Sequence, residues 1–334
     1  MKLVTYLSHT SVDDHDAPRL GLLLLGGPSG DEVIDLETAS SELATPLPHD
    51  ILPFLHLGEP AMLAARKVET SAQEHAHLFR DKNARLPRTS VTLLAPVPRP
   101  ASMRDGYAFR QHVEAARRNR GVEMIPEFDQ FPVFYFTNHQ AVIGPGPMEV
   151  MPEHLNRLDY ELEAAIVIGK EGRTIKAADA DGYIAGYTIM NDWSARALQM
   201  EEMKLSLGPA KGKDFATAIG PWLVTKDELA NKRIPSEQGE RYDLTMTASL
   251  NGKELSRGNL KDMTWTFAQI IERASYGVTL YPGDVIGSGT VGTGCLLELN
   301  GSKVTDNLWV KAGDTVTCAI DLLGELTNTV VLAR

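Results

Sequence analysis

Short apolar segments separated by glycine and proline run through most of the chain after residue 97. Their lengths and their content of β-branched and aromatic residues are typical of strands. The segments predicted as strands are FPVFYFTN (131–138), EAAIVIG (163–169), GYIAGYTIM (182–190), PWLVT (221–225), YDLTMTASLNG (242–252), DVIGSG (284–289), CLLELNG (295–301) and DTVTCAI (314–320). One longer stretch, WTFAQIIERASY (265–276), has helical periodicity. Frequent strands joined by few helices predict an α+β, mainly β fold with a mixed β-rich core, not a doubly wound α/β sheet.

The first 97 residues have a different pattern. A strand-like start, KLVTYLS (2–8), and an apolar run, RLGLLLLGG (19–27), precede a helical stretch at 50–76. The segment TSVTLLAPVPRPASM (89–103) then interrupts any regular element with three prolines. We therefore predict a smaller N-terminal lobe over residues 1–97 and a catalytic domain over residues 98–334.

Composition and charge narrow the range of partners. The chain has 334 residues, 43% hydrophobic and 23% charged, as in an ordinary soluble globular protein of one or two domains. A formal net charge of -11 argues against a nucleic-acid partner and gives no reason to expect an anionic membrane. The one basic run, AARRNRG (115–121), is interpreted as a solvated helix face or as an anchor for an anionic small molecule.

The only cysteines are Cys295 and Cys318, and neither lies in a CxxC motif or near a histidine in the sequence. This spacing indicates neither a zinc site nor a disulfide framework, and it fits a reducing compartment. The N-terminus MKLVTYLSHT lacks the basic region and long apolar stretch of a secretory signal peptide. We therefore expect a cytoplasmic protein.

The segment GSGTVG (287–292) has the glycine spacing of a dinucleotide-binding loop. That mechanism requires a helix N-terminus directly after the loop, whereas the following CLLELNG is predicted as a strand. The glycines are better explained by a tight turn or by close approach of the backbone to a ligand.

Acidic residues suggest a metal site. Glu161 and Glu163 stand two apart at the start of an apolar strand, so their carboxylates point to the same face. Such a pair repels unless a cation or a proton lies between them, and oxygen ligands suit Mg²⁺, Ca²⁺ or Mn²⁺ rather than zinc. A solvated strand edge is the alternative interpretation.

Three segments concentrate further polar residues. RDGYAFRQHVEAARR (104–118) carries Asp105, and GPAKGKDFATAIGPW (208–222) carries Lys213 and Thr217. In NDWSARALQ (191–199), Asp192, Arg196 and Gln199 have the i, i+4, i+7 spacing of one helical face. A ligand at Asp192 would then lie beside Arg196 and Gln199.

At these segments the chain resembles the fumarylacetoacetate hydrolase family. The shared elements occur in the family's order: DYELE (159–163), MNDWSAR (190–196) followed by a Gln, GP-x-x-GK-x-F-x-T (208–217), and the SGT turn (288–290) followed by LEL (297–299). RDGYAFRQH (104–112) is similar to the segment of fumarylacetoacetases in which the first metal-binding Asp precedes an Arg-Gln-His. Over residues 98–334 the resemblance implies a mixed β-roll catalytic domain behind a variable N-terminal lobe, in a protein that is commonly a homodimer.

The resemblance also implies roles for individual residues. The divalent cation, Mg²⁺ first and Ca²⁺ or Mn²⁺ as alternatives, would be held by Asp105, Glu161, Glu163 and Asp192, with Lys213 and Thr217 supporting the site from behind. His112 would be the general base, and Glu298 would orient it. Stabilisation of an oxyanion would fall to Arg196, Gln199 and Lys213, and contact with the substrate to Tyr107, Tyr135, Gln199 and Thr290.

Two departures from the fumarylacetoacetase pattern stand out. Met203 occupies the position of a tyrosine, and no single residue stands for the arginine that grips the substrate, although Arg117, Arg118 and Arg120 are candidates. The reaction class is therefore better supported than the particular substrate.

Three functions are compatible with these residues. The first is hydrolysis of a carbon-carbon bond in a 1,3-diketone acid such as fumarylacetoacetate or an acylpyruvate, by water that the His112 and Glu298 pair activates. The second is a lyase or isomerase of a 2-keto acid: an oxaloacetate-type decarboxylase, a hydratase or a tautomerase. The third, a catalytically silent metal-binding protein, predicts loss of a carboxylate or of the base, and none is missing. We expect the hydrolase, since decarboxylation needs no activated water.

Overall fold

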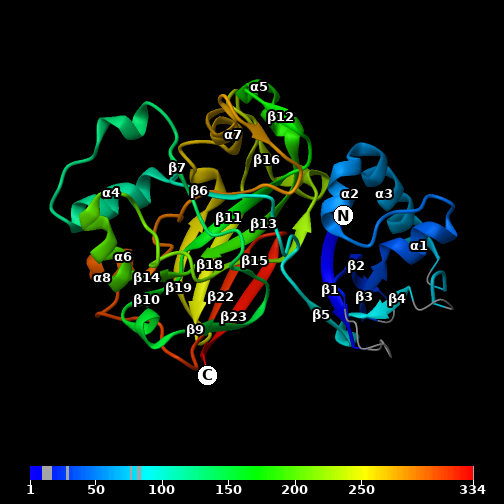
Figure 1. Ribbon diagram of the computed structural model, residues 1–334, viewed down its shortest axis with the longest axis horizontal. Helices are drawn as coiled ribbons and strands as arrows, with labels where there is room; N and C mark the ends of the chain where they lie inside the picture. Colours follow the sequence, from blue (N-terminus) through cyan, green and yellow to red (C-terminus); the bar gives the residue numbers. More distant parts are fainter. Residues whose placement is uncertain (10–16, 28–29, 76, 81–83, 334) are drawn as a thin grey trace.

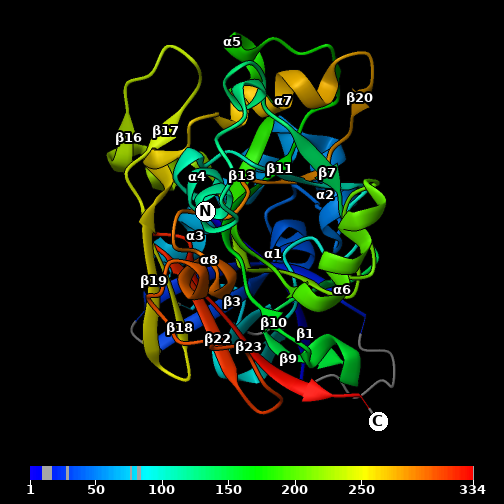
Figure 2. The ribbon, with the colours of Figure 1, turned by 90° about the vertical axis from the view of Figure 1, so that its left-hand side faces the viewer.

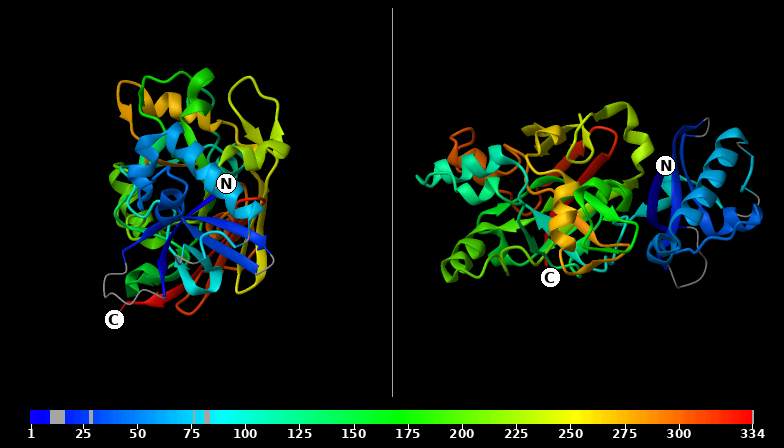
Figure 3. Two further views of the ribbon diagram at one scale, coloured as in Figure 1. Left: turned by 90° about the vertical axis from the view of Figure 1, so that its right-hand side faces the viewer. Right: turned by 90° about the horizontal axis from the view of Figure 1, so that it is seen from above.

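The computed structural model describes residues 1–9, 17–27, 30–75, 77–80 and 84–333. The N-terminal segment lies at one end of the molecule, and the remaining chain forms the larger part beside it (Figure 1; Figure 3, right). The architecture is mixed α+β and rich in sheet, as the sequence predicted. Among the described residues, no helix is both long enough and apolar enough to cross a bilayer.

The largest sheet runs through both parts of the chain. Its strand order is β4-β3-β2-β1-β15-β13-β11-β21-β6-β7, with β5 beside β1 and β8 beside β15. The strands are β1 (Lys2–Ser8), β2 (Arg19–Gly27), β3 (Gly30–Asp35), β4 (Arg85–Pro87), β5 (Val91–Leu93), β6 (Met103–Gly106), β7 (Phe134–Phe136), β8 (Val142–Ile143), β11 (Leu162–Ile168), β13 (Ile184–Asp192), β15 (Thr217–Val224) and β21 (Val285–Gly287). β11 is buried along its whole length, which explains its unbroken apolar sequence.

A second, five-stranded sheet has the order β19-β18-β22-β23-β9. Its strands are β9 (Gly146–Val150), β18 (Thr245–Leu250), β19 (Lys253–Asn259), β22 (Thr315–Ile320) and β23 (Gly324–Leu332). Buried and partly exposed residues alternate along β18 and β22, as expected where one face of a sheet covers the core. Three two-stranded sheets are formed by β10 (Leu158–Asp159) with β14 (Ser194–Ala195), β12 (Gly172–Arg173) with β20 (Thr279–Leu280), and β16 (Arg233–Ile234) with β17 (Arg241–Tyr242).

The α-helices lie around the sheets. They are α1 (Leu36–Glu42), α2 (Ile51–Leu57), α3 (Glu59–Glu74), α4 (Arg110–Asn119), α5 (Ala177–Ala180), α6 (Arg196–Glu202), α7 (Phe267–Ser275) and α8 (Leu296–Gly301). Helices α4, α6 and α8 gather on the side away from the N-terminal segment, and Figure 2 looks onto that side. This side carries the candidate site.

The helical stretch predicted at 50–76 forms two helices. The Asp50 side chain caps α2, and Gly58, at a φ of 62°, ends it. The first turn of α3 then contains a proline. Proline lacks a backbone N–H, and an N–H at this position would have no acceptor within the helix. Ala76, the last residue of the predicted stretch, lies outside the described residues.

The N-terminal segment shares its core with the rest of the chain. Phe54 and Val68, from the helices, belong to one cluster of buried residues with Leu22 of β2 and with Val167 of β11. Strand β1 also pairs with β15, so the large sheet continues across residue 97. The division into two domains at that residue stays a prediction.

The strand predicted for CLLELNG is wrong, because this segment forms helix α8. The backbone N–H groups of Leu296 and Leu297 donate to the carboxylate of Asp159, at 2.7 and 3.0 Å. A carboxylate that accepts from the first N–H groups of a helix stabilises its start. This partner lies more than a hundred residues away in the sequence, so the local pattern could not reveal it.

Arg85→Ala is expected to lower the free energy of unfolding by about 3–5 kcal/mol, since it leaves the buried carboxylate of Glu32 without its main partner. Arg85 donates twice to Glu32, at 2.6 and 2.8 Å, and both side chains are 3% exposed. The matched control is Arg66→Ala, because Arg66 pairs with Asp227 where the side chains are 40% and 46% exposed. Such a surface pair contributes about 0–1 kcal/mol. Urea unfolding measures both, and equal losses would contradict the prediction.

Candidate metal centre and active site

The four predicted metal-binding carboxylates meet in one cluster. Each offers an oxygen that lies within 4.8 Å of the oxygens of the others, and all four residues are buried: Asp105, Glu161, Glu163 and Asp192. Burial of four carboxylates side by side requires compensating charge or protons. The solvated strand edge, the alternative interpretation of Glu161 and Glu163, is therefore wrong.

Neighbouring strands bring these carboxylates together. Glu163 lies in β11 and Asp105 in β6, and the intervening strand β21 ends at Gly287, directly beside Asp105. A side chain at Gly287 would place its Cβ 2.6 Å from Asp105 Oδ1 and 3.0 Å from Glu163 Oε2. The glycine therefore leaves the space in which the carboxylates meet. Asp192 ends β13, the strand on the other side of β11.

The donor set fits a hard divalent cation. Tyr135 and Lys213 both donate to Asp192 Oδ2, at 2.5 and 2.6 Å, whereas the buried Oδ1 of Asp192 has no hydrogen-bond partner. An unsatisfied carboxylate oxygen beside three further carboxylates offers the all-oxygen coordination that Mg²⁺, Ca²⁺ and Mn²⁺ prefer. Lys213 also donates to Glu161, at 2.5 Å, so it neutralises part of the negative charge.

The pKa values of the cluster show that it favours a proton or a bound cation among its carboxylates. Burial, with the nearby charge of Asp192, raises the pKa of Asp105 to about 8. Burial and Asp105 raise the pKa of Glu163 well above its usual range. Burial would also raise the pKa of Glu161, but Lys213 and Arg196 lower it below its ordinary value. Without a cation, the Asp105 and Glu163 pair therefore retains a proton at neutral pH, and a bound cation would replace it.

Binding of Mg²⁺ is expected to weaken as the pH falls below 8, by about tenfold per pH unit for each proton that the ion displaces. The metal-free protein should show the opposite trend in stability. A carboxyl group whose pKa is raised, as that of Asp105 is to about 8, stabilises the fold below its unfolded pKa of about 4, and this contribution is lost as the pH rises through 8. Calorimetric titration with Mg²⁺ at pH 6, 7 and 8 measures the affinity, and a pH-independent affinity would contradict the prediction.

The glycine loop 287–292 serves the carboxylate cluster. Gly289, at a φ of 79°, donates its N–H to Asp105 Oδ1 and to Glu163 Oε2, at 3.1 and 3.0 Å. A helix does follow this loop, contrary to the prediction, but Asp159 occupies the first N–H groups of that helix. The segment is therefore a tight turn that approaches the carboxylates, and its helix N-terminus is closed to a phosphate.

His112 and Glu298 form a buried pair in the same region. His112 Nδ1, on α4, lies 2.6 Å from Glu298 Oε2, on α8. The second carboxylate oxygen of Glu298 accepts the N–H of Thr293, at 2.9 Å. Because the carboxylate can only accept, Nδ1 carries the imidazole hydrogen and Nε2 is left as the basic nitrogen. The arrangement is that of a base with an orienting carboxylate.

Arg196 links the predicted site residues, although not along one helical face. Asp192 ends β13 and α6 begins only at Arg196, so the predicted i, i+4, i+7 face is wrong. Arg196 instead donates to Asp159, to Gln199 Oε1 and to Glu161, at 2.9, 2.9 and 2.7 Å. Each part of its guanidinium thus positions another polar side chain. The amide NH₂ of Gln199 remains available to a ligand.

Asp159 was missed by the sequence reasoning. It holds both Arg196 and the start of α8. The signal was present, since Asp159, Glu161 and Glu163 alternate in DYELE and therefore share one side of an extended chain.

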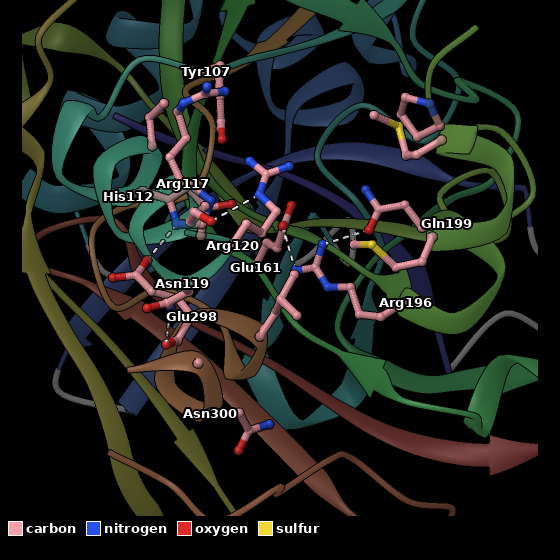
Figure 4. Close-up of a pocket in the computed structure, with 18 of the residues that line it drawn as sticks. Tyr107, His112, Arg117, Asn119, Arg120, Glu161, Arg196, Gln199, Glu298 and Asn300 are labelled. Atoms are coloured by element: carbon pink, nitrogen blue, oxygen red, sulfur yellow. Dashed lines mark hydrogen bonds and ion pairs between the residues drawn. The ribbon is translucent and has the colours of Figure 1, made fainter. Parts of the chain in front are cut away.

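A cavity of about 1300 Å³ joins these groups (Figure 4). The predicted residues that line it are Asp105, Tyr107, His112, Tyr135, Glu161, Arg196, Gln199, Lys213, Thr290 and Glu298. Tyr107 meets the His112 ring edge to face, with 5.8 Å between ring centroids. The Thr290 hydroxyl lies 3.4 Å from Glu163 Oε1. Thr217 pairs with Asp192 across the strands, but its hydroxyl faces Thr137, at 3.5 Å.

The sequence profile of the fumarylacetoacetate (FAA) hydrolase C-terminal domain matches residues 101–331. The chain belongs to the fumarylacetoacetate hydrolase family. Members of this family are enzymes that act on small molecules and generally use a divalent metal ion. At this general level, the chain is therefore an enzyme of small-molecule metabolism.

Two curated relatives are named for the same reaction. The chain is 32% identical over 306 residues to a mitochondrial oxaloacetate tautomerase of Rattus norvegicus, covering 90% of this chain and 85% of the relative. It is 33% identical over 287 residues to a mitochondrial oxaloacetate tautomerase of Homo sapiens, covering 85% and 81%. A solved structure, the fumarylacetoacetate hydrolase of Exiguobacterium antarcticum, superimposes over 100% of both chains with a TM-score of 0.71 at 24% identity and so supports the fold.

The expectation of a cytoplasmic protein is contradicted by these relatives, which are named as mitochondrial proteins. Two cysteines outside any pairing motif are compatible with every reducing compartment, not only with the cytoplasm. The lack of a secretory signal likewise bears on secretion alone.

Two features distinguish this family member from the fumarylacetoacetase pattern. Met203, which replaces a tyrosine, lines the cavity. Of the three candidate arginines, Arg117 and Arg120 line the cavity, whereas Arg118 is absent from the lining among the described residues (Figure 4). An anionic end of a substrate would therefore meet Arg117 and Arg120.

Proposed function

We propose that the protein is a metal-dependent tautomerase that interconverts the enol and keto forms of a 2-oxo dicarboxylic acid of the oxaloacetate class. The observation that carries the proposal is the His112 and Glu298 pair in a cavity that Asp105 and Glu161, two members of the four-carboxylate cluster, also line. Together they offer a base for a proton on the carbon next to a carbonyl, and a cation site for the oxygens of that carbonyl.

The relatives favour tautomerisation over hydrolysis. Two that cover most of this chain at 32% and 33% identity are named oxaloacetate tautomerases. The argument for hydrolysis from the sequence was the retained base, but this argument does not discriminate. A histidine that can take a proton from water can equally take one from the carbon beside a carbonyl.

The cofactor that fits the site is Mg²⁺, with Mn²⁺ or Ca²⁺ as alternatives. Asp105, Glu161, Glu163 and Asp192 would hold it, because they form a buried all-oxygen set in which Asp192 Oδ1 has no other partner. When bound, such a cation supplies Lewis acidity toward the oxygens of a 2-oxo acid.

The side chains move and direct one proton. In the keto-to-enol direction, Nε2 of His112 takes the proton from the carbon next to the carbonyl and delivers it to the carbonyl oxygen, and the enol-to-keto direction is the reverse. Glu298 holds Nδ1 and stabilises the positive charge that the ring acquires in between. Gln199, fixed by Arg196, donates its amide to a substrate oxygen. Arg117 and Arg120, which line the cavity, meet the second carboxylate of the acid.

Cleavage of a 1,3-diketone acid is the second candidate function. The observation that favours it is the cavity volume of about 1300 Å³, which exceeds the need of a four-carbon acid and leaves room for an acyl group. The same base would then act on water.

The test follows loss of enol absorbance with oxaloacetate, acetylpyruvate and fumarylpyruvate in the presence of Mg²⁺, and identifies the products by NMR. We expect enol oxaloacetate to ketonise with its carbon skeleton intact, at a rate that chelation of Mg²⁺ abolishes. If a diketone is cleaved into two acids and oxaloacetate is not ketonised, the protein is a hydrolase and not a tautomerase. Release of pyruvate from oxaloacetate would identify a decarboxylase.

A further inference from the structure

The buried thiol of Cys295 lies beside the His112 and Glu298 pair. One ligand atom from each of the three residues lies within 4.8 Å of the others, and all three side chains are buried. Cys295 immediately precedes α8, whose third residue is Glu298, and α8 packs against α4, which carries His112. No local pattern indicates this neighbourhood, since 183 positions separate the cysteine from the histidine.

The donor atoms of this triad differ in kind from those of the carboxylate cluster. Sulfur and imidazole nitrogen with one carboxylate oxygen suit zinc and similar borderline ions, whereas four carboxylates suit hard cations. His112 and Glu298 line the cavity, so a fourth coordination position would face its interior. Three protein ligands with an open fourth position form a complete set for zinc.

We propose that His112, Cys295 and Glu298 form a second metal site, which takes Zn²⁺ or an ion of similar preference and blocks the base when occupied. The thiol loses one proton to solvent on binding, because only the thiolate is a ligand. The ion takes the place of the hydrogen that Nδ1 shares with Glu298, and the imidazole hydrogen moves to Nε2. Coordination through Nε2 instead would occupy the base directly. Either way His112 can no longer accept a proton.

The resting protein keeps this site closed to hard cations. Burial raises the pKa of the Cys295 thiol well above its usual range, so the sulfur is neutral until an ion with high affinity for thiolate displaces its proton. Mg²⁺ has little affinity for thiolate and remains with the carboxylates. Zinc and magnesium should therefore occupy separate sites in one cavity.

The experiment measures Zn²⁺ and Co²⁺ binding in the presence of excess Mg²⁺, for the full chain and three variants. Wild type and Cys318→Ala should bind zinc, and their Co²⁺ forms should show the absorption band of a thiolate ligand. Cys318 is the matched control, because it is also a buried free cysteine but lies in β22, outside the triad. Cys295→Ala should lack the band and lose at least about 10–100-fold in zinc affinity, the cost of losing even an indirect partner of a metal ligand. Cys295→Ser, which keeps the size of the side chain, should also lose the band.

Inhibition provides the second readout and rests on the proposed function. Zinc should inhibit wild type and Cys318→Ala despite excess Mg²⁺, while Cys295→Ala, compared with its own rate without zinc, should resist inhibition. Equal zinc inhibition of Cys295→Ala, or Co²⁺ binding without a thiolate band in wild type, would overturn the proposal. Binding and absorption need no substrate, so they test the site even if the tautomerase assay fails.

Discussion

Glu163→Gln is expected to lose binding of the divalent cation and, with it, about a thousandfold or more in activity. A bound cation stabilises developing charge by several kcal/mol, and about 4 kcal/mol corresponds to a factor of about a thousand in rate. Glu163 lies beside Asp105 in the cluster, and both carboxylates accept the Gly289 N–H. Glutamine keeps this shape but offers a neutral oxygen in place of a carboxylate.

The metal-free variant should remain as stable as the metal-free wild type. Burial and Asp105 raise the pKa of Glu163 well above its usual range, so glutamine imitates the neutral acid of the metal-free protein. The loss of activity would then result from the missing negative charge of the metal ligand and not from unfolding.

Thermal unfolding with and without Mg²⁺ separates the two effects. Magnesium at about 100 times its dissociation constant should stabilise the wild type by about 2.7 kcal/mol and leave Glu163→Gln unchanged. The control is Asp284→Asn, which removes another buried carboxylate near β21 that bonds Ser102 and the backbone of Tyr281 instead of the cluster. If Glu163→Gln still gains stability from Mg²⁺, Glu163 is not a ligand of the cation.

The clustering of the four carboxylates was only partly predictable from a local pattern. Glu161, directly before β11, and Glu163, within it, stand two apart in an extended chain and so share a face. The family resemblance supplied Asp105 and Asp192. The mixed, sheet-rich fold followed similarly from short apolar segments with turns between them.

The errors arose where a distant partner decides the local structure. CLLELNG has no strong periodicity. The carboxylate of Asp159, distant in the sequence, accepts a hydrogen bond from the N–H of Leu296 and so stabilises the start of the helix. The position of Cys295 beside His112 depends on how α8 packs against α4. Such contacts join segments far apart in the sequence, and no spacing rule for a single segment contains them.

His112→Ala should lower kcat by about 10²–10⁴-fold while leaving Mg²⁺ affinity unchanged, because general-base catalysis contributes about this much. Loss of Mg²⁺ binding in this variant would indicate a structural role instead. Glu298→Gln should fall between wild type and His112→Ala, since the imidazole loses its orienting carboxylate but keeps its nitrogen.

The double variant tests whether the two residues act as one unit. Because Glu298 acts only through the ring of His112, to which it is joined at 2.6 Å, adding Glu298→Gln to His112→Ala should cost nothing further in kcat. Exchange of the carbon-bound hydrogens of oxaloacetate with solvent deuterium, followed by NMR, reports the same proton directly. Wild type should accelerate the exchange and His112→Ala should not. Unimpaired exchange in His112→Ala would require another base, and additive losses in the double variant would separate Glu298 from the proton transfer.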